Sequence, residues 1–356
     1  MDVLSAHHPN QNVTLASRIN ASNFFYFLIT LQTVGIKTKY FFFEIFSCSG
    51  IVVWSISHIV ARRVWQSNLL LRPKFCYATI IMSQYPVPIP DMITSAANDE
   101  VKRLRALHER KFRKQTGWFL AEGVRICHEA VALGWAMHRL AFVAGREDDR
   151  QVRTLLSGLV ESRGRALPMT DSLLQRISRK DNPQMVLGAF AQRWNDLDQV
   201  GRTPDECWVA LDRVRDPGNL GTVMRTADAV GAEGLILVGD CTDPYSVEAV
   251  RASMGAVFNV RIIACSEAEF LKFTAGWQGH VIGTALPAAV DYRTADYAGS
   301  LIMLMGNEQA GLTSDLMNAC TQLIKIPMLG RSDSLNLAVA NGVALYEALA
   351  KRGQSN

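Results

Sequence analysis

Three runs of this 356-residue chain place glycines and polar side chains directly after apolar segments. They are residues 216–227, 305–312 and 326–340. Open α/β sheets bind ligands at the ends of their strands, so these positions are candidates for one shared site. The residue types suit a sugar or a phosphate. A guanidinium can bind a phosphate, amides and hydroxyls can hold a hydroxyl group, and glycines let the backbone approach a ligand closely.

The first run offers Asn219 and Arg225. Short apolar segments bounded by turn formers predict strands at residues 207–211 and 235–238, with a helix at residues 221–230 between them. Such a βαβ unit turns a helix N-terminus towards the end of a strand, which is a natural anion site. Asn219 is expected in the loop, and Arg225 one turn into the helix. The alternative interpretation is a turn asparagine and a solvated arginine.

The second run offers Glu308, which lies between Gly306 and Gly311 after a predicted strand at residues 301–305. Both glycines allow close approach to a ligand or a left-handed backbone. The Glu308 carboxylate can accept hydrogen bonds from a ligand or orient a neighbouring arginine. The alternative interpretation is a glycine-rich loop with a solvated carboxylate.

The third run offers Ser334 and Asn336, which follow a predicted strand at residues 323–326. Ser334 is a good N-cap for a helix that begins near Leu335, and this role would be purely structural. Asn336 would then be an early helix position, where asparagine is a mediocre helix former. The pair therefore indicates selection for contacts rather than for helix stability.

Together and in this order, the three runs resemble the motifs of the SpoU/TrmH branch of the SPOUT RNA methyltransferases. The resemblance covers about residues 93–352. It implies an α/β fold with a knotted parallel-sheet domain (a deep trefoil knot), S-adenosylmethionine as cofactor, and homodimers with active sites near the subunit interface. The implied catalytic cluster is Asn219, Arg225, Glu308, Ser334 and Asn336. The implied positions around the adenine end of the cofactor are Gly306, Ile326 and Leu335.

The implied reaction is methyl transfer to a ribose 2′-hydroxyl of RNA. Alignment of the hydroxyl oxygen with the methyl carbon can supply much of the acceleration. In the family, the motif arginine is proposed to assist removal of the proton, but arginine essentially never deprotonates in proteins. We therefore expect Arg225 to bind the adjacent phosphate and to stabilise charge on the oxygen, with Ser334 and Asn336 orienting it or the ribose.

Residues 92–190 resemble the small α/β substrate-binding domain, L30e-like, that often precedes the methyltransferase domain in this family. Val101, Leu104 and Leu107 fall at helical spacing, so one face should pack while the other is basic. Basic side chains would supply affinity for RNA phosphates, whereas the alternative is an ordinary solvated face. The predicted RNA contacts are Lys102, Arg103, Arg105, Arg110, Lys111, Arg113 and Lys114.

The predicted organisation places a polar linker at residues 191–206 before the methyltransferase domain at residues 207–356. Both domains are large enough to bury a core. The net charge of +4 is mild, so RNA affinity must come from local patches. The seven cysteines show no CxxC pair or metal spacing, which predicts reduced thiols and no metal site.

Three other functions compete with ribose methylation. A catalytically silent RNA-binding protein is disfavoured by the intact motif residues. A knotted methyltransferase acting on an RNA base is disfavoured by the run from Ser334 to Asn336. A Rossmann oxidoreductase is disfavoured because no G-x-G-x-x-G opens the βαβ unit. The accessory domain favours rRNA over tRNA as substrate.

Residues 1–91 differ from the rest, with few charges and long aromatic and apolar runs. Residues 45–61 carry no formal charge, which is at the short limit for a membrane helix. An organelle presequence is a second alternative. Because Met82 and Met92 both precede the family-like start, our hypothesis is that translation starts at one of them. Residues 1–81 would then come from a misassigned start codon, and the protein is expected to be cytoplasmic without membrane contact.

Overall fold

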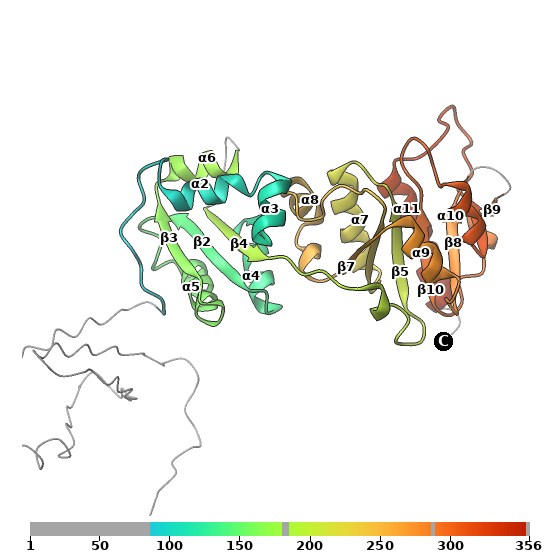
Figure 1. Cartoon of the computed structure of the whole chain (residues 1–356), viewed down its shortest axis with the longest axis horizontal. Coiled ribbons are helices and arrows are strands. Elements are labelled where there is room, and N and C mark those ends of the chain that lie inside the picture. Colours follow the sequence, from blue (N-terminus) through green and yellow to red (C-terminus); the bar gives the residue numbers. More distant parts are fainter. Residues whose placement is uncertain (1–85, 180–184, 286–288, 354–356) are drawn as a thin grey trace, which may run out of the picture. The chain divides into compact units, whose positions relative to one another are not determined.

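Two sheets with helices on both faces make up the part of the chain that the computed structural model describes, residues 86–179, 185–285 and 289–353 (Figure 1). The hypotheses about residues 1–81 lie outside the described residues. From Val87 onward the chain belongs to one compact unit. Below, the N-terminal half means residues 87–191, and the C-terminal half means residues 206–353.

The N-terminal half contains a four-stranded mixed sheet in the order β1-β4-β2-β3. β4 is antiparallel to both neighbours, while β2 and β3 are parallel. Helices α2 and α6 cover one face, and α4 and α5 the other (Figure 1). The strands are β1 (Trp118–Glu122), β2 (Met137–Val143), β3 (Arg165–Met169) and β4 (Val186–Ala191). The helices are α2 (Asp99–Ala106), α3 (Arg110–Thr116), α4 (Val124–Ala132), α5 (Arg150–Ser162) and α6 (Asp171–Ser178).

The C-terminal half contains a seven-stranded sheet in the order β7-β6-β5-β10-β8-β11-β9, and every pairing is parallel. This confirms the predicted α/β class with a parallel sheet. The strands are β5 (Cys207–Asp212), β6 (Gly234–Val238), β7 (Arg261–Cys265), β8 (His280–Thr284), β9 (Val290–Asp291), β10 (Leu301–Met305) and β11 (Gln322–Lys325).

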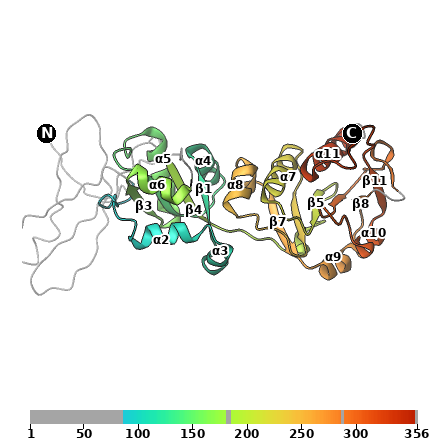
Figure 2. The same ribbon diagram turned by 90° about the horizontal axis from the view of Figure 1, so that it is seen from above.

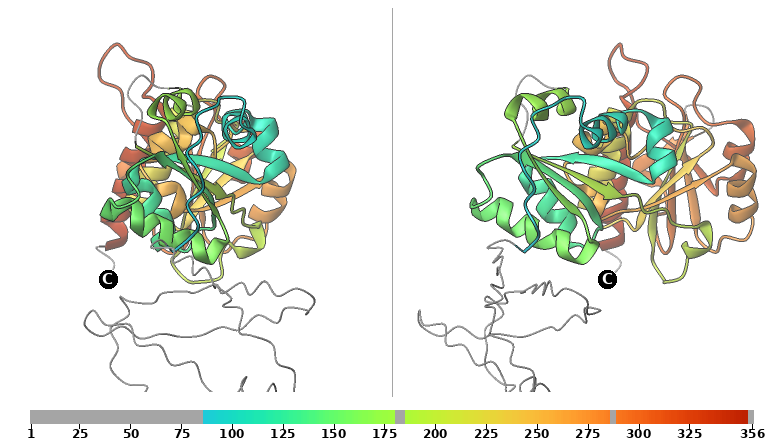
Figure 3. Two further views of the ribbon diagram at one scale, coloured as in Figure 1. Left: turned by 90° about the vertical axis from the view of Figure 1, so that its left-hand side faces the viewer. Right: turned by 60° about the vertical axis from the view of Figure 1, so that its left-hand side comes forward.

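Helices α7, α8 and α11 lie on one side of this sheet, with α9 and α10 on the other (Figure 2). The segment between β11 and α11 extends away from the sheet (Figure 3), and Leu329 within it is fully exposed. The helices are α7 (Pro217–Ala229), α8 (Val247–Ser253), α9 (Glu267–Thr274), α10 (Ser314–Ala319) and α11 (Leu337–Gly353). Single 3₁₀ turns are η1 (Leu197–Gln199), η2 (Ala256–Phe258) and η3 (Tyr292–Thr294).

Several local predictions can be compared with these elements. The strands predicted before the first two runs are confirmed as β5 and β10. Helix α7 begins four residues earlier than predicted, at Pro217, because proline suits the first helical position and the Asp216 carboxylate accepts from the Asn219 backbone N–H at 2.6 Å. Asn219 therefore lies in the first turn of α7 and not in a loop. The packing face of the predicted basic helix is also confirmed, since Val101 and Leu104 on α2 are fully buried.

Two ion pairs that are largely shielded from solvent join the two halves. Arg113 of α3 contacts Asp243 in the loop after β6 at 2.8 Å. In the opposite direction, Arg251 of α8 contacts Glu122 of β1 at 2.6 Å and also donates to the Ser178 carbonyl at 2.8 Å. Each half thus contributes one arginine and one carboxylate to the junction. Buried pairs hold their partners in place because separating them leaves a charge without compensation.

Glu206 holds the end of the segment that connects the two halves. Its carboxylate is 2% exposed and accepts from the Gly201 and Thr203 backbone N–H groups, the Thr203 hydroxyl and the Trp208 indole at 2.6–2.8 Å. Burial by itself would raise the pKa of this carboxyl. The hydrogen bonds outweigh burial and lower the pKa from the ordinary 4.5 to about 2.

We predict that Glu206→Gln lowers the free energy of unfolding by about 2 kcal/mol near neutral pH, because an NH₂ group would face N–H donors. The folded pKa lies below the ordinary value, so the carboxylate stabilises the fold fully above about pH 4.5 and loses this effect as the pH falls towards 2. Urea unfolding of both proteins at neutral pH and near pH 3 checks this. A difference that stays constant with pH would contradict it.

Within the described ranges, no helix is long and apolar enough to cross a membrane. The same ranges hold no group of three or more His, Cys, Asp or Glu side chains that could bind a metal ion. Their cysteines are free thiols: Cys127, Cys207, Cys241, Cys265 and Cys320.

Candidate functional site

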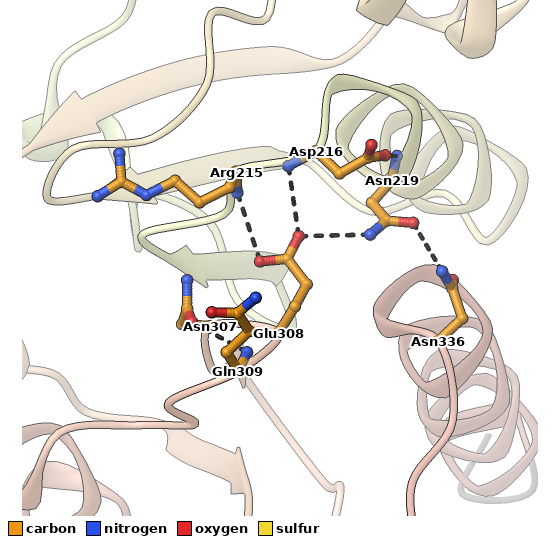
Figure 4. Close-up of a pocket in the computed structure, with 7 residues that line it drawn as sticks. All are labelled: Arg215, Asp216, Asn219, Asn307, Glu308, Gln309 and Asn336. Carbon is orange, nitrogen blue, oxygen red and sulfur yellow. Dashed lines mark hydrogen bonds between the residues drawn. The ribbon is translucent and has the colours of Figure 1, made fainter.

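An open pocket of about 500 Å³ lies at the carboxyl ends of β5 and β10, where all three polar runs supply residues (Figure 4). Neighbouring parallel strands end at the same edge of a sheet, so runs that are far apart in sequence meet there. The volume is typical of sites for small molecules or for one nucleotide unit. The lining residues are Arg215, Asp216, Asn219, Asn307, Glu308, Gln309 and Asn336.

A chain of hydrogen bonds crosses this pocket. The Glu308 carboxylate accepts from the Asn219 side-chain amide at 3.3 Å and from the Arg215 and Asp216 backbone N–H groups at 3.4 and 3.5 Å. Asn219 Oδ1 in turn accepts from Asn336 Nδ2 at 2.9 Å. Each amide nitrogen carries two N–H bonds and uses one here, so a second donor on Asn219 and on Asn336 can bind a ligand oxygen.

Asn336 also begins helix α11. Its Oδ1 accepts from the Ala338 and Val339 backbone N–H groups at 2.9 and 3.3 Å, which makes Asn336 the N-cap. The alternative interpretation, in which Ser334 caps this helix, is therefore wrong. The chain enters the helix two residues later than expected, because an asparagine side chain caps as well as serine. Ser334 itself is exposed and does not line the pocket.

Asn307 shapes the wall formed by the second run. Its Oδ1 accepts from the Gln309 and Ala310 backbone N–H groups, both at 3.0 Å, and its Nδ2 donates to the Arg213 carbonyl at 2.9 Å. Asn307 thus ties the second run to the chain just after β5. Sequence reasoning did not single it out. An asparagine that opens a glycine-containing loop is the signal for such a turn.

Gly306 lies buried at the end of β10. A Cβ atom there would lie 2.6 Å from both the Gly311 carbonyl carbon and the Leu312 nitrogen, so only glycine fits. Ile326 is half-buried just after β11, and Leu335, just before α11, is 38% exposed. All three follow strands that end at the carboxyl edge of one sheet, and apolar side chains such as those of Ile326 and Leu335 suit the flat base of a nucleoside. They lie outside the polar lining of the pocket.

Comparison with known proteins shows which family this chain resembles. Residues 206–346 match the model of the SpoU rRNA Methylase family, and residues 98–188 match the MRM3-like substrate binding domain. A 23S rRNA (uridine(2479)-2′-O)-methyltransferase of Streptomyces viridochromogenes is 33% identical over 253 residues, covering 69% of this chain and 87% of that protein. This chain belongs to the SpoU family.

Other SpoU-type proteins extend the likeness. The crystal structure of an AdoMet-bound rRNA methyltransferase from Sinorhizobium meliloti is 44% identical, covers 73% of this chain and 98% of that one, and superposes with a TM-score of 0.70. The 23S rRNA (guanosine(2553)-2′-O)-methyltransferase RlmP of Bacillus subtilis is 26% identical over 254 residues, or 71% of this chain and 97% of that protein. The two named 23S rRNA relatives act on different nucleosides, uridine and guanosine.

Arg225, which the sequence predicted for the catalytic cluster, lies away from the pocket lining. It is exposed on α7 and does not line the pocket. It lies six positions after Asn219, and six steps of 100° turn a side chain to a different side of a helix. Within a single polypeptide, the fold therefore brings together Asn219, Glu308 and Asn336, but not Arg225.

The basic residues of the substrate-binding half divide into two groups. Arg113 is 3% exposed, pairs with Asp243 and donates to the Leu107 and His108 carbonyls at 2.8 Å. The prediction that Arg113 contacts RNA is therefore wrong, because its guanidinium is enclosed by protein acceptors. The exposed members are Lys102, Arg103, Arg105, Arg110, Lys111 and Lys114.

Proposed function

We propose that this chain transfers a methyl group from S-adenosylmethionine to a ribose 2′-hydroxyl of RNA, and that the RNA is ribosomal. The observation that carries the proposal is the hydrogen-bonded chain from Glu308 through Asn219 to Asn336, which joins three runs at one strand edge. The activity named for the 33% identical relative supports the reaction. The AdoMet in the Sinorhizobium meliloti structure supports the cofactor.

S-adenosylmethionine, when bound, supplies an electrophilic methyl group on a sulfonium. The residues that would hold its adenosine end are Gly306, Ile326 and Leu335. The second N–H of Asn219 and that of Asn336 would bind the ribose hydroxyls, and Glu308 holds the Asn219 amide in the required orientation. Fixing the reacting oxygen in this way lowers the entropic cost of the step. Arg225 would stabilise the charge that develops on that oxygen.

We also propose that two copies associate. Helix α11 exposes Val339 and Tyr346 by 52% and 53%. Gly342 lies between them on the same stripe, where an added Cβ would be 3.8 Å from Thr226 Cγ2 of α7. Exposed apolar surface of this kind suits a protein interface. Arg225 directly precedes Thr226 on α7, and we infer that dimerisation through this stripe would place Arg225 beside the pocket of the partner subunit.

This arrangement predicts complementation. Arg225→Ala should lose methyl transfer when it is the sole species. Co-expression with Asn336→Asp should restore about a quarter of wild-type activity, because half of the dimers are mixed and each mixed dimer holds one intact site. Methyl transfer by the purified mixture, with sedimentation to establish the dimer, measures this. Dimers that form without any recovery would place Arg225 in its own subunit's reaction.

The finer domain assignment is also a proposal. Residues 92–190 would form an L30e-like RNA substrate-binding domain, residues 191–206 a linker, and residues 207–356 a methyltransferase domain with a trefoil knot. The strand order supports the knot, because β10 enters between β5 and β8, and β11 between β8 and β9. We also propose that the enzyme works in the cytoplasm. The proposed RNA contacts are Lys102, Arg103, Arg105, Arg110, Lys111 and Lys114.

Tritium transfer tests the function. The full chain is incubated with labelled S-adenosylmethionine and with bulk rRNA or tRNA from a strain that lacks the gene, and nuclease digestion locates the label. Label on a ribose 2′-oxygen of rRNA is the expected result. Label on a base would assign the protein to another knotted class. Cofactor binding without transfer to either RNA, or to assembled ribosomal subunits, would indicate a silent RNA-binding protein.

A further inference from the structure

Helix α3 meets the loop between β6 and α8 through two arginine–aspartate pairs with the same three-residue spacing. The inner pair, Arg113 with Asp243, is 2.8 Å apart, and its side chains are 3% and 10% exposed. The outer pair, Arg110 with Asp240, is 3.7 Å apart, and its side chains are 50% and 68% exposed. The inner pair therefore anchors α3 against the loop, while the outer pair is held loosely in solvent.

Asp240 has a second partner in the C-terminal half. The Arg215 guanidinium contacts its carboxylate at 2.7 Å, and the Arg215 side chain is 61% exposed. This hydrogen bond is the main reason that the pKa of Asp240 lies below its usual range, so the carboxylate is charged at neutral pH. Arg215 lines the pocket, and its backbone N–H donates to Glu308. One carboxylate thus lies between an arginine of the substrate-binding half and an arginine of the pocket.

We propose that Arg110 and Arg215 form a single binding site for a phosphate of the RNA backbone, and that Asp240 holds this site until the phosphate displaces it. The inference rests on the proposed function and names where the RNA strand passes from α3 into the pocket.

Two features of the pairs support exchange with phosphate. Exposed ion pairs contribute little to stability, so releasing Asp240 into solvent is inexpensive. Guanidinium groups bind phosphate oxygens through two parallel hydrogen bonds, which a phosphate between two arginines can receive from both sides. The buried Arg113–Asp243 pair keeps α3 in place while the outer pair opens.

The test is RNA binding by the full-length chain, measured by anisotropy of a short fluorescein-labelled single-stranded RNA over a range of KCl concentrations. Asp240→Asn should bind about three to five times tighter than wild type, because a competing carboxylate is removed. The matched control is Asp198→Asn, which makes the same change of charge at another exposed pair, that with Arg202 at 3.5 Å. The control should bind like wild type.

The arginine variants supply the second arm. The double variant Arg110→Gln/Arg215→Gln should reduce the magnitude of the slope of log K against log salt by about 0.7, the value for one phosphate contact on a single strand, and each single variant should reduce it by less. In the double arginine variant, Asp240→Asn should no longer tighten binding. An Asp240→Asn protein that binds no tighter than the control would overturn the proposal. A gain that persists without both arginines would also overturn it.

Methyl transfer to bulk rRNA by the wild-type chain is measured in parallel. If the wild type methylates rRNA but Asp240→Asn binds RNA no tighter than the control, the proposed phosphate site is wrong and the proposed function stands. If the wild type binds RNA as expected without methylating it, the function is wrong and the phosphate site stands.

Discussion

Asn336→Asp should reduce methyl transfer by at least about a hundredfold with little change in melting temperature, since removing one preorganised donor has effects of this size. Aspartate keeps the oxygen that caps α11 and accepts from the Ala338 and Val339 backbone N–H groups. It loses the N–H that donates to Asn219 at 2.9 Å. It also adds a third carboxylate to a pocket that is already lined by Asp216 and Glu308.

The comparison with Asn336→Ala separates the two roles of this side chain. Alanine removes both the donor and the cap, so it should lose the same activity and, in addition, about 1 kcal/mol of stability. Initial rates of tritium transfer and urea unfolding of both variants provide the measurement. Wild-type-like turnover by the aspartate variant would remove Asn336 from the site, whatever its effect on α11.

Gly306→Ala should abolish detectable binding of S-adenosylmethionine and lower the free energy of unfolding by about 2 kcal/mol, a typical effect of overpacking. The new methyl group would lie 2.6 Å from two backbone atoms at Gly311 and Leu312, and backbone cannot move aside as a flexible side chain can. The loop that carries Glu308 would have to shift, which disrupts the polar wall of the pocket and the proposed adenosine site together.

Gly330→Ala is the matched control, because a Cβ at Gly330 meets no atom within 4 Å. Isothermal titration with S-adenosylmethionine and thermal unfolding should show a control that behaves like wild type. If Gly306→Ala binds the cofactor with unchanged affinity, the second run does not form part of the cofactor site.

Local patterns in the sequence were sufficient for the elements that carry the polar runs. Strands β5 and β10 could be predicted because short apolar segments end at glycine and proline turns. The buried face of α2 could be predicted because Val101 and Leu104 follow helical spacing. In each case the deciding residues lie within a few positions of one another, and their burial follows from periodicity.

The remaining features depend on partners far away in the chain. In the sequence Arg113 looks like one more basic residue, but in the fold it is buried against Asp243, which lies in the loop after β6. The neighbouring position of β5 and β10 brings Asn219 to Glu308, and no periodicity encodes the order of parallel strands. The sequence offered Ser334 as an alternative N-cap of α11, but Asn336 caps the helix, because serine and asparagine cap equally well and only the path of the chain decides between them.

The two ion pairs at the junction fix the distance between the RNA-binding half and the pocket, and this distance bears on which RNAs the enzyme can bind. Arg113 and Arg251 are each held by a carboxylate of the opposite half, so the protein sets the separation between the basic helices and the pocket. An RNA-binding domain on a flexible linker would accept RNAs with many different distances between the bound segment and the modified nucleotide. Because both ion pairs fix this separation, we expect the chain to select an RNA by the distance between the segment bound by the basic helices and the nucleotide at the pocket, as well as by the identity of that nucleotide.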